Sequence, residues 1–207
     1  MIDRLSVRCW WMWLAVPALL VLAGCGEAPL DRLSAGDRIL AFGDSLTEGV
    51  GAPDGAAYPA QLEALTGHAV INAGVSGETT AEAVTRLPAV LDRHEPALMI
   101  LLTGGNDVLQ NRNPIRAKAN IARMIELARG RGVQVVLVGV PRKSLFSNSA
   151  PLYRELADFY HVVLVDDLVA DLLRRPGYKS DAVHLNAAGY RAMAERLDEV
   201  LRESGAL

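Results

Sequence analysis

Five short apolar runs recur along the chain, and longer segments of mixed polarity separate them. They cover residues 38–42, 69–72, 98–102, 133–138 and 162–165. Runs such as LMILL and VVLV lack the alternation of apolar and polar positions that a strand with one solvent-facing side shows. We therefore predict strands that are buried on both faces, as in a parallel sheet.

Helix signals occur in the segments between these runs. Thr79 and Glu82 have the spacing of a capping box, and Pro88 is expected to kink or end the helix that follows. Asn113-Pro114 combines an N-cap with a proline at the first helical position. Gly130 lies where the end of that helix is expected.

The last helix is predicted from apolar residues at three- and four-residue spacing. They are Tyr190, Met193, Ala194, Leu197, Val200 and Leu201. Strands that alternate with helices favour an α/β fold of three layers, in which a five-stranded parallel sheet lies between helices and the crossovers are right-handed. We predict a single domain at residues 38–207.

The N-terminus has a different pattern. From Cys9 to Ala23, 15 consecutive residues carry no charge, and all three Trp of the chain lie in this run. A membrane-spanning helix needs about 20 apolar residues, and Pro17 interrupts this run. Because Arg4 and Arg8 precede it, the run is typical of a signal peptide, which we predict to cover residues 1–24.

The predicted signal peptide leads into Leu22-Ala23-Gly24-Cys25, which looks like a bacterial lipobox. In a lipobox the leader is cleaved before the Cys, and the Cys is lipidated. The alternatives are an ordinary secretory signal with an incidental Cys and an uncleaved anchor. We expect lipidation of Cys25, a tether at residues 25–37 and a lipid-anchored position in the bacterial cell envelope, facing the periplasm or the exterior. No internal disulfide is expected, because Cys9 leaves with the leader.

The net charge of the chain and the spacing of its histidines bear on whether it binds nucleic acid or a metal ion. The chain has 21 Lys and Arg against 24 Asp and Glu, a formal net charge of −3. The sequence contains no basic patch of the kind that binds nucleic acid, so we expect no such partner. The spacing of His68, His94 and His161 matches no metal-binding motif, and we expect no metal or other cofactor.

Candidate chemistry lies where the predicted strands end, because ligands of an open parallel sheet bind beyond the carboxyl ends of its strands. The first strand leads into Gly43-Asp44-Ser45-Leu46. The second leads into Asn72-Ala73-Gly74 with Ser76-Gly77 behind, and the third into Gly104-Gly105-Asn106-Asp107. Each turn has a group that can donate a hydrogen bond, and we expect the three turns to meet at one edge of the sheet.

A further polar pair, Asp181 and His184, lies between the last predicted strand and the final helix. A spacing of three residues lets both side chains point the same way on a turn. Asp181 can then hold Nδ1–H of the imidazole and leave Nε2 free to take a proton from Ser45. Ser45, His184 and Asp181 thus form a candidate triad.

Each group also has a structural interpretation. Gly-x-Ser turns follow strands in many α/β proteins, and His184 could flank a helix and bond to backbone. Asn106-Asp107 could form an ordinary turn or a helix cap. The combination of these groups in one chain order, at one predicted edge, favours the catalytic interpretation.

Together these blocks resemble the GDSL, or SGNH, hydrolases. The resemblance rests on Gly43-Asp44-Ser45-Leu46, Gly74, Gly104-x-Asn106-Asp107 and Asp181-x-x-His184, and it spans residues 38–201. The flanking sequences GDSLTEGVG, NAGVSGETT and TGGNDVLQN are similar to the bacterial thioesterase, lysophospholipase and arylesterase branch. The resemblance implies a flavodoxin-like arrangement of the sheet.

The resemblance also implies roles for individual residues. Ser45 would be the nucleophile, His184 the general base and then acid, and Asp181 the residue that orients His184. The oxyanion hole would consist of the backbone N–H groups of Ser45 and Gly74 and the side-chain amide of Asn106. One departure is visible, because Leu185 follows the catalytic His where the family often has Pro.

Three functions compete. The favoured one is a serine esterase that hydrolyses small carboxylic esters or thioesters through an acyl-enzyme, with the acyl group beside the loop Val140–Ser149. That loop could instead be a solvated connection. The alternatives are an O-acetylesterase acting on carbohydrate or cell wall, and a lipoprotein that only binds its ligand. An α/β-hydrolase is disfavoured, because Ser45 does not stand in Gly-x-Ser-x-Gly.

Overall fold

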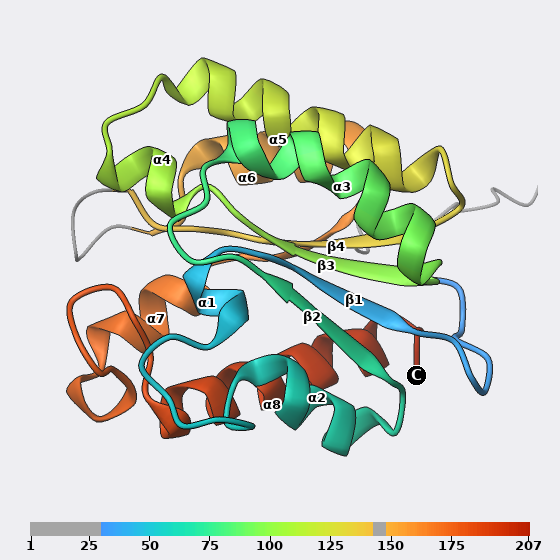
Figure 1. The fold of residues 1–207 in the computed structure, drawn as a ribbon, viewed down its shortest axis with the longest axis horizontal. Helices are drawn as coiled ribbons and strands as arrows, with labels where there is room; N and C mark the ends of the chain where they lie inside the picture. Colours follow the sequence, from blue (N-terminus) through green and yellow to red (C-terminus); the bar gives the residue numbers. More distant parts are fainter. Residues whose placement is uncertain (1–29, 143–147) are drawn as a thin grey trace, which may run out of the picture.

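The computed structural model describes residues 30–142 and 148–207, and in these ranges five parallel strands form one sheet (Figure 1). The strands are β1 Ile39–Gly43, β2 Val70–Gly74, β3 Leu98–Leu102, β4 Gln134–Val138 and β5 Val163–Val165. Their order across the sheet is β2-β1-β3-β4-β5. The predicted α/β fold with a five-stranded parallel sheet is therefore confirmed.

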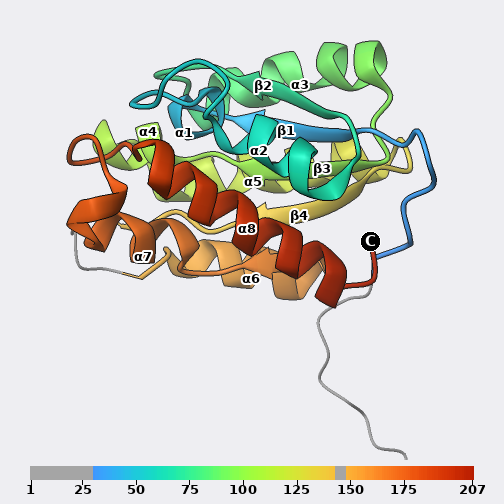
Figure 2. The same cartoon turned by 90° about the horizontal axis from the view of Figure 1, so that it is seen from below.

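Helices cover both faces of this sheet (Figures 1 and 2). On one face lie α3 Thr80–His94, α5 Pro114–Arg129 and α6 Pro151–Tyr160. On the other lie α2 Tyr58–Thr66, α7 Leu168–Arg174 and α8 Ala187–Glu203. Short helices α1 Ser45–Glu48 and α4 Gly105–Leu109 follow β1 and β3, and a 3₁₀ turn spans Pro176–Tyr178.

Burial explains why the strands lack polar alternation. Every residue of β1 and β3 is buried, since both strands lie inside the sheet and under helices on both sides. The edge strand β2 is more exposed beyond Val70. The apolar face predicted for the last helix is also buried, and α8 packs closely on α2.

The chain changes direction across the sheet at β1. β2 is added on one side of β1, whereas β3, β4 and β5 follow on the other. Gly43 at the end of β1 therefore lies beside Gly74 of β2 and Leu102 of β3. A switch point of this kind leaves room for a ligand at the carboxyl ends of the strands.

Three of the predicted helix signals can be compared with the helices of the structure. Glu82 Oε2 accepts hydrogen bonds from the N–H and the hydroxyl of Thr79, and Asn113 Oδ1 accepts one from the Ile115 N–H at 2.9 Å. Of the two effects expected of Pro88, a kink or an end of its helix, the end does not occur, because α3 continues to His94. Burial of the apolar face of α3 against the core stabilises the helix despite the missing N–H of Pro88.

The first described residues lie at the opposite end of the strands from the switch point. Leu30 and Leu33 donate backbone hydrogen bonds of 2.8 Å to Ser204 and Ala206, next to the end of α8. Asp31 exchanges two hydrogen bonds with the side chain of Gln134, the first residue of β4. The predicted tether is therefore docked on the domain from residue 30 onward.

The predicted signal peptide at 1–24 and Cys25 lie outside the described residues. Within the part of the chain that the structure describes, none of the helices has the length and apolar character needed to cross a membrane.

Candidate active site

Ser45 is the first residue of α1, directly after β1. Asp44 caps this short helix, and its Oδ1 accepts the Leu46 N–H at 3.1 Å. Gly43 has to be glycine, because a Cβ there would lie 2.0 Å from the Leu102 carbonyl oxygen of β3. Close strand packing followed at once by a capped turn places Ser45 at the carboxyl edge, half-buried.

His184 contacts both Ser45 and Asp181, and its contact with Asp181 is the one that their spacing predicts. His184 Nε2 is 3.1 Å from Ser45 Oγ, and His184 Nδ1 is 2.7 Å from Asp181 Oδ2. The other carboxylate oxygen of Asp181 accepts the N–H groups of Val183 and His184, each at 2.8 Å. The three side chains therefore form a hydrogen-bonded chain with the geometry of a Ser–His–Asp triad.

Backbone hydrogen bonds hold the turn that carries Asp181 and His184. The Ser180 N–H donates to the His184 carbonyl, and the Asn186 N–H donates to the Tyr178 carbonyl, each at 3.0 Å. Leu185, which stands where the family often has Pro, is fully buried and forms a β-bridge with Lys179. Burial and this bridge hold Leu185 in place directly after His184.

Hydrogen bonds keep Asp181 ionised at neutral pH. The bond from His184, followed by the backbone N–H of Val183, lowers the pKa of Asp181 to about 2. Its side chain is 54% exposed, so burial opposes this shift only weakly. Asp181 can therefore hold Nδ1–H of His184 in one tautomer throughout the neutral range.

Asp44, which precedes Ser45 in the chain, is buried, whereas Asp181 is exposed. Asp44 is only 3% exposed, and burial raises its pKa to about 6, although the Leu46 N–H and His184 lower it. The Gly105 N–H also lowers the pKa of Asp44. Asp44 therefore stands between the turn that carries Ser45 and the start of α4.

Asn106 and Asp107 are neighbours in the chain, but their side chains bond to different partners. Asp107 is buried and accepts the N–H and the hydroxyl of Thr80, each at 2.8 Å, at the start of α3. Asn106 donates one amide hydrogen to the Glu78 carbonyl at 3.0 Å. A primary amide has two N–H donors, so one remains for a ligand in the cavity that Asn106 lines.

Gly74 is not positioned as the resemblance implies. Its N–H donates to Asn72 Oδ1 at 2.9 Å, and Gly74 does not line the cavity beside Ser45. A Cβ at Gly74 would lie 2.1 Å from the Glu48 nitrogen, so this glycine allows β2 to pack against α1. The close approach that requires glycine here is to a helix backbone and not to a substrate.

Gly77 is the glycine of this segment that lines the cavity. It has a φ of +79°, a conformation that favours glycine, and the space beside its Cα is open. Among the described residues, neither the N–H of Gly77 nor that of Ser45 donates a hydrogen bond. In the sequence Gly74 follows the predicted strand 69–72 by two residues and Gly77 by five, and only their positions in space show which one lines the cavity.

A cavity of about 260 Å³ opens beside Ser45. Ser45, Asn106 and His184 line it together with Ser76 and Gly77. The rest of its wall is mainly apolar and comes from α1, α4, α7, the segment after β4 and the turn before His184: Leu46, Val108, Leu109, Val140, Pro141, Val169, Ala170, Leu173, Ala182 and Val183. Arg142 is the one Arg or Lys that lines it within the described ranges.

Part of the predicted acyl-binding loop can be assessed. Val140, Pro141 and Arg142 line the cavity, whereas Leu145 and Phe146, the two apolar residues inside the loop, lie outside the described residues.

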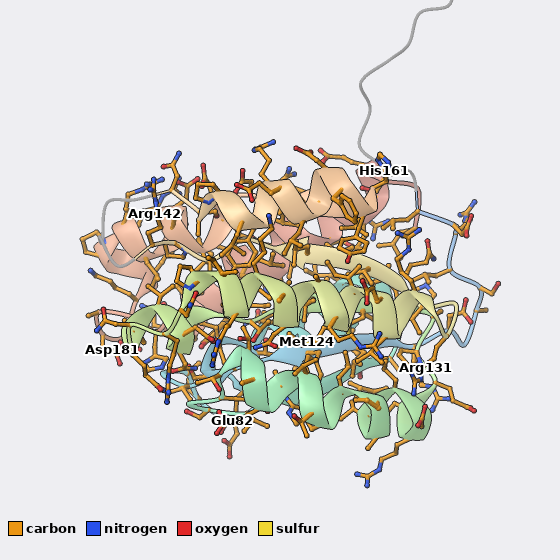
Figure 3. All side chains as sticks on the ribbon, turned by 90° about the horizontal axis from the view of Figure 1, so that it is seen from above. Glu82, Met124, Arg131, Arg142, His161 and Asp181 are labelled. Atoms are coloured by element: carbon orange, nitrogen blue, oxygen red, sulfur yellow. The ribbon has the colours of Figure 1, made fainter. Side chains whose placement is uncertain are left out.

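In the side-chain view, Arg142 and Asp181 lie at one end of the molecule and Arg131 and His161 at the other (Figure 3). Within the described residues no group of three His, Cys, Asp or Glu side chains is arranged to hold a metal ion.

Comparison with known proteins identifies relatives of this chain. The sequence model of the GDSL-like Lipase/Acylhydrolase family matches residues 41–192. Esterase TesA of Pseudomonas aeruginosa is 34% identical over 142 residues, which are 66% of this chain and 69% of that protein. An arylesterase of Vibrio mimicus is 32% identical over 172 residues, 78% of this chain and 84% of that protein. Thioesterase 1/protease 1/lysophospholipase L1 of Escherichia coli is 26% identical over 163 residues, 75% of this chain and 78% of that protein.

Solved structures agree with this similarity. AlinE4, an SGNH-hydrolase family esterase, superposes with a TM-score of 0.65 at 32% identity, covering 83% of this chain and 98% of that one. A structure of TesA gives a TM-score of 0.68 at 28% identity, over 81% and 97% of the two chains. The psychrotrophic esterase EstA from Pseudoalteromonas shares the fold, with a TM-score of 0.74 at 18% identity, over 81% and 97%.

Proposed function

We propose, since the chain belongs to the GDSL-like lipase/acylhydrolase family, that this hydrolase cleaves esters through an acyl-enzyme formed on Ser45. The observation that carries the proposal is the hydrogen-bonded chain from Asp181 through His184 to Ser45, which ends at the wall of an apolar cavity. A serine hydroxyl is a weak nucleophile until an adjacent base takes its proton. The 3.1 Å contact supplies that base.

In the proposed reaction, His184 Nε2 accepts the proton of Ser45 Oγ as that oxygen bonds to the carbonyl carbon of the ester. The tetrahedral intermediate expels the alcohol or thiol, which takes the proton from His184 and leaves acyl-Ser45. A water molecule then gives its proton to His184, and its oxygen adds to the acyl carbon. The carboxylic acid departs as Ser45 Oγ regains the proton.

Three donors would stabilise the negative oxygen of both intermediates. We assign the backbone N–H groups of Ser45 and Gly77 and the second amide hydrogen of Asn106 to this role. Support comes from their position on the cavity wall and from the open space beside Gly77. Donors aimed in advance at the developing charge are usually the largest single contribution to such a reaction. Gly77 thus replaces Gly74 in the proposed set.

The substrate class is inferred from the cavity wall. Its apolar residues suit a hydrocarbon chain better than the hydroxyl groups of a sugar, which favours a small acyl ester or thioester over an O-acetylated glycan. Pockets for drug-sized ligands measure roughly 300–1,000 Å³, so 260 Å³ suits one acyl chain of short to medium length. The relatives named arylesterase and thioesterase/lysophospholipase are consistent with such substrates.

A hydrolysis panel tests this assignment. Leaderless protein would be supplied with aryl esters of increasing acyl length, acyl-CoA, lysophospholipid and acetylated glycan, with Ser45→Ala as the blank. We expect kcat/KM to rise from acetyl to medium-chain esters and then to fall. Release of acetate from glycan at a higher kcat/KM than cleavage of every acyl ester would instead establish the O-acetylesterase. A protein that binds esters without turnover would establish the binding lipoprotein.

We further propose that Cys25 carries a lipid anchor that holds the enzyme in the cell envelope. The lipobox-like sequence supports this anchor, and residue 30 is docked at the end of the strands opposite the cavity. The five residues from Cys25 to Leu30 reach at most about 18 Å, whereas a domain of this length is roughly 40 Å across. The cavity would therefore face away from the membrane that holds the anchor.

Fatty-acid labelling of the full chain tests this proposal. Wild-type protein should be labelled and recovered with membranes, and Cys25→Ser should be neither labelled nor cleaved. Because all three Trp precede Cys25, the processed protein should also lack indole fluorescence. Labelling of the Cys25→Ser variant, or indole emission from fully processed protein, would show that the anchor is misassigned.

A further inference from the structure

A partly buried ion pair lies next to the proposed oxyanion donors. Arg86 of α3 donates to both carboxylate oxygens of Glu78, through Nε to Oε1 and through Nη2 to Oε2 at 2.7 Å. The Glu78 side chain is 5% exposed and that of Arg86 25% exposed. Neither residue lines the cavity beside Ser45.

The same guanidinium also binds the ends of two strands. Arg86 Nη2 donates to the Gly43 carbonyl at 3.2 Å and to the Ala73 carbonyl at 2.9 Å. Its Cζ lies 4.1 Å from the centre of the Phe42 ring, within cation–π range. Gly43 precedes the Asp44-Ser45 turn, so Arg86 contacts the strand that delivers the nucleophile as well as the segment that contains Gly77.

Glu78 connects this ion pair to two oxyanion donors. Its backbone carbonyl accepts the Asn106 amide at 3.0 Å, and the residue before it is Gly77. The turn from Val75 to Glu78 has one internal backbone bond, from the Glu78 N–H to the Val75 carbonyl at 3.2 Å. The bidentate contact with Arg86 is a charge-assisted restraint on Glu78, and it adds to the bonds that the Ser76 N–H donates to Glu48 Oε2 at 2.5 Å and the Val75 N–H donates to the Gly43 carbonyl at 3.0 Å.

We propose that Arg86, acting through Glu78, is a positioning residue that sets the geometry of the oxyanion hole. One planar, permanently charged fork joins the end of β1, the end of β2 and the Gly77-Glu78 turn, which no shorter or singly donating side chain could do. Arg86 thus aligns donors that come from three separate segments. The inference rests on the proposed ester hydrolysis and adds a residue that the family resemblance does not supply.

Substitution of Arg86 tests the role through the separate values of kcat and KM. In Arg86→Gln we expect kcat on a medium-chain aryl ester to fall roughly 10–100-fold with KM nearly unchanged, because misplacement of donors by about 1 Å costs up to about 100-fold. Arg86→Lys should recover only part of the loss, since Lys cannot form a bidentate bond. Assays well below each variant's Tm keep the folded fraction constant.

Arg131→Gln is the matched control. Arg131 also pairs with a carboxylate of α3, Asp92, at 2.8 Å, and also donates to a backbone carbonyl, that of Leu127. It lies at the other end of the molecule from Asp181 (Figure 3). We expect wild-type kcat from Arg131→Gln. Equal losses of kcat in the two variants would reduce Arg86 to a contributor to general stability.

A double-mutant cycle with Asn106→Ala separates positioning from destabilisation. If Arg86 acts on the oxyanion donors, Arg86→Gln should cost markedly less in the Asn106→Ala background than in the wild type. Fully multiplicative losses would overturn the inference, and so would wild-type kcat in Arg86→Gln. Failure of the proposed function is distinguishable, because the wild-type enzyme would then show no turnover that Ser45→Ala abolishes.

Discussion

The two halves of the candidate active site are built in contrasting ways. Asp181 and His184 come from one short turn, are three residues apart and are held by bonds within that turn. Ser45, Gly77 and Asn106 come from three separate segments and depend on buried groups such as Asp44 and Glu78. The acid–base half is therefore local and partly exposed, whereas the oxyanion half exists only when the sheet is assembled.

The carboxylates of the two halves show the same contrast. Asp181 is exposed and amply hydrogen-bonded, and its pKa is lowered to about 2. Asp44 is buried, and its pKa is raised to about 6. Solvation and donors decide the charge on each, although both lie in short turns beside the same nucleophile.

Removal of the nucleophile or the base should give the largest effect. We expect Ser45→Ala and His184→Ala each to lower kcat by about 10⁶-fold, and the double variant to lose little more, because the two groups act in one step. Steady-state kinetics on an aryl ester measure this. A double variant far slower than either single one would separate the two residues into independent steps.

Replacement of Asp181 tests the acid–base half alone. In Asp181→Asn the amide can present N–H to Nδ1 and favour the wrong tautomer of His184, so we expect kcat to fall by about 10⁴-fold. Asp158→Asn, an exposed carboxylate of α6, is a suitable control. Retention of activity in Asp181→Asn would mean that the turn orients His184 without its carboxylate.

Asn106 tests the oxyanion half. Asn106→Ala should lower kcat by about 10²–10³-fold with little change in KM, because the lost interaction is strongest in the transition state. Asn106→Asp should be at least as damaging, since a carboxylate repels the developing charge. Near wild-type kcat in Asn106→Asp would indicate a capping role and would remove Asn106 from the oxyanion hole.

The smallest expected effect is on the pH dependence of folding stability, to which Asp44 and Asp181 contribute with opposite sign. The folded-state pKa of Asp44 is above its unfolded value, so its contribution to stability is present at low pH and is lost as pH rises from about 4 to 6, by roughly 3 kcal/mol at most. The folded-state pKa of Asp181 is lowered, so its smaller contribution is lost as pH falls from about 4 to 2.

Thermal unfolding of Asp44→Asn and Asp181→Asn across this range measures both slopes. Asp44→Asn should flatten the decline in Tm between about pH 4 and 6, and Asp181→Asn should flatten the acid limb below about pH 4. If both variants alter the same limb, the contrast between a buried and a hydrogen-bonded carboxylate is wrong.

Features that depend on neighbours in the chain could be predicted from the sequence. Doubly buried strands require unbroken apolar runs, and parallel strands bring their carboxyl ends to one edge, so Ser45 and Asn106 could be assigned to that edge. Asp181 and His184 were predictable as a pair because a turn brings residues three apart together. The capping box at Thr79 follows the same local rule.

Tertiary packing decided the rest. Gly74 and Gly77 differ in role because α1 packs against the first and leaves open space beside the second, and no pattern along the chain encodes that difference. Arg86 appears in the sequence as one charged residue on a helix, yet it binds Gly43, Ala73 and Glu78 together. Local spacing determines which groups the chain can offer at the sheet edge. Contacts between segments far apart in the chain decide which of those groups face the cavity, because only folding brings their backbones within bonding distance.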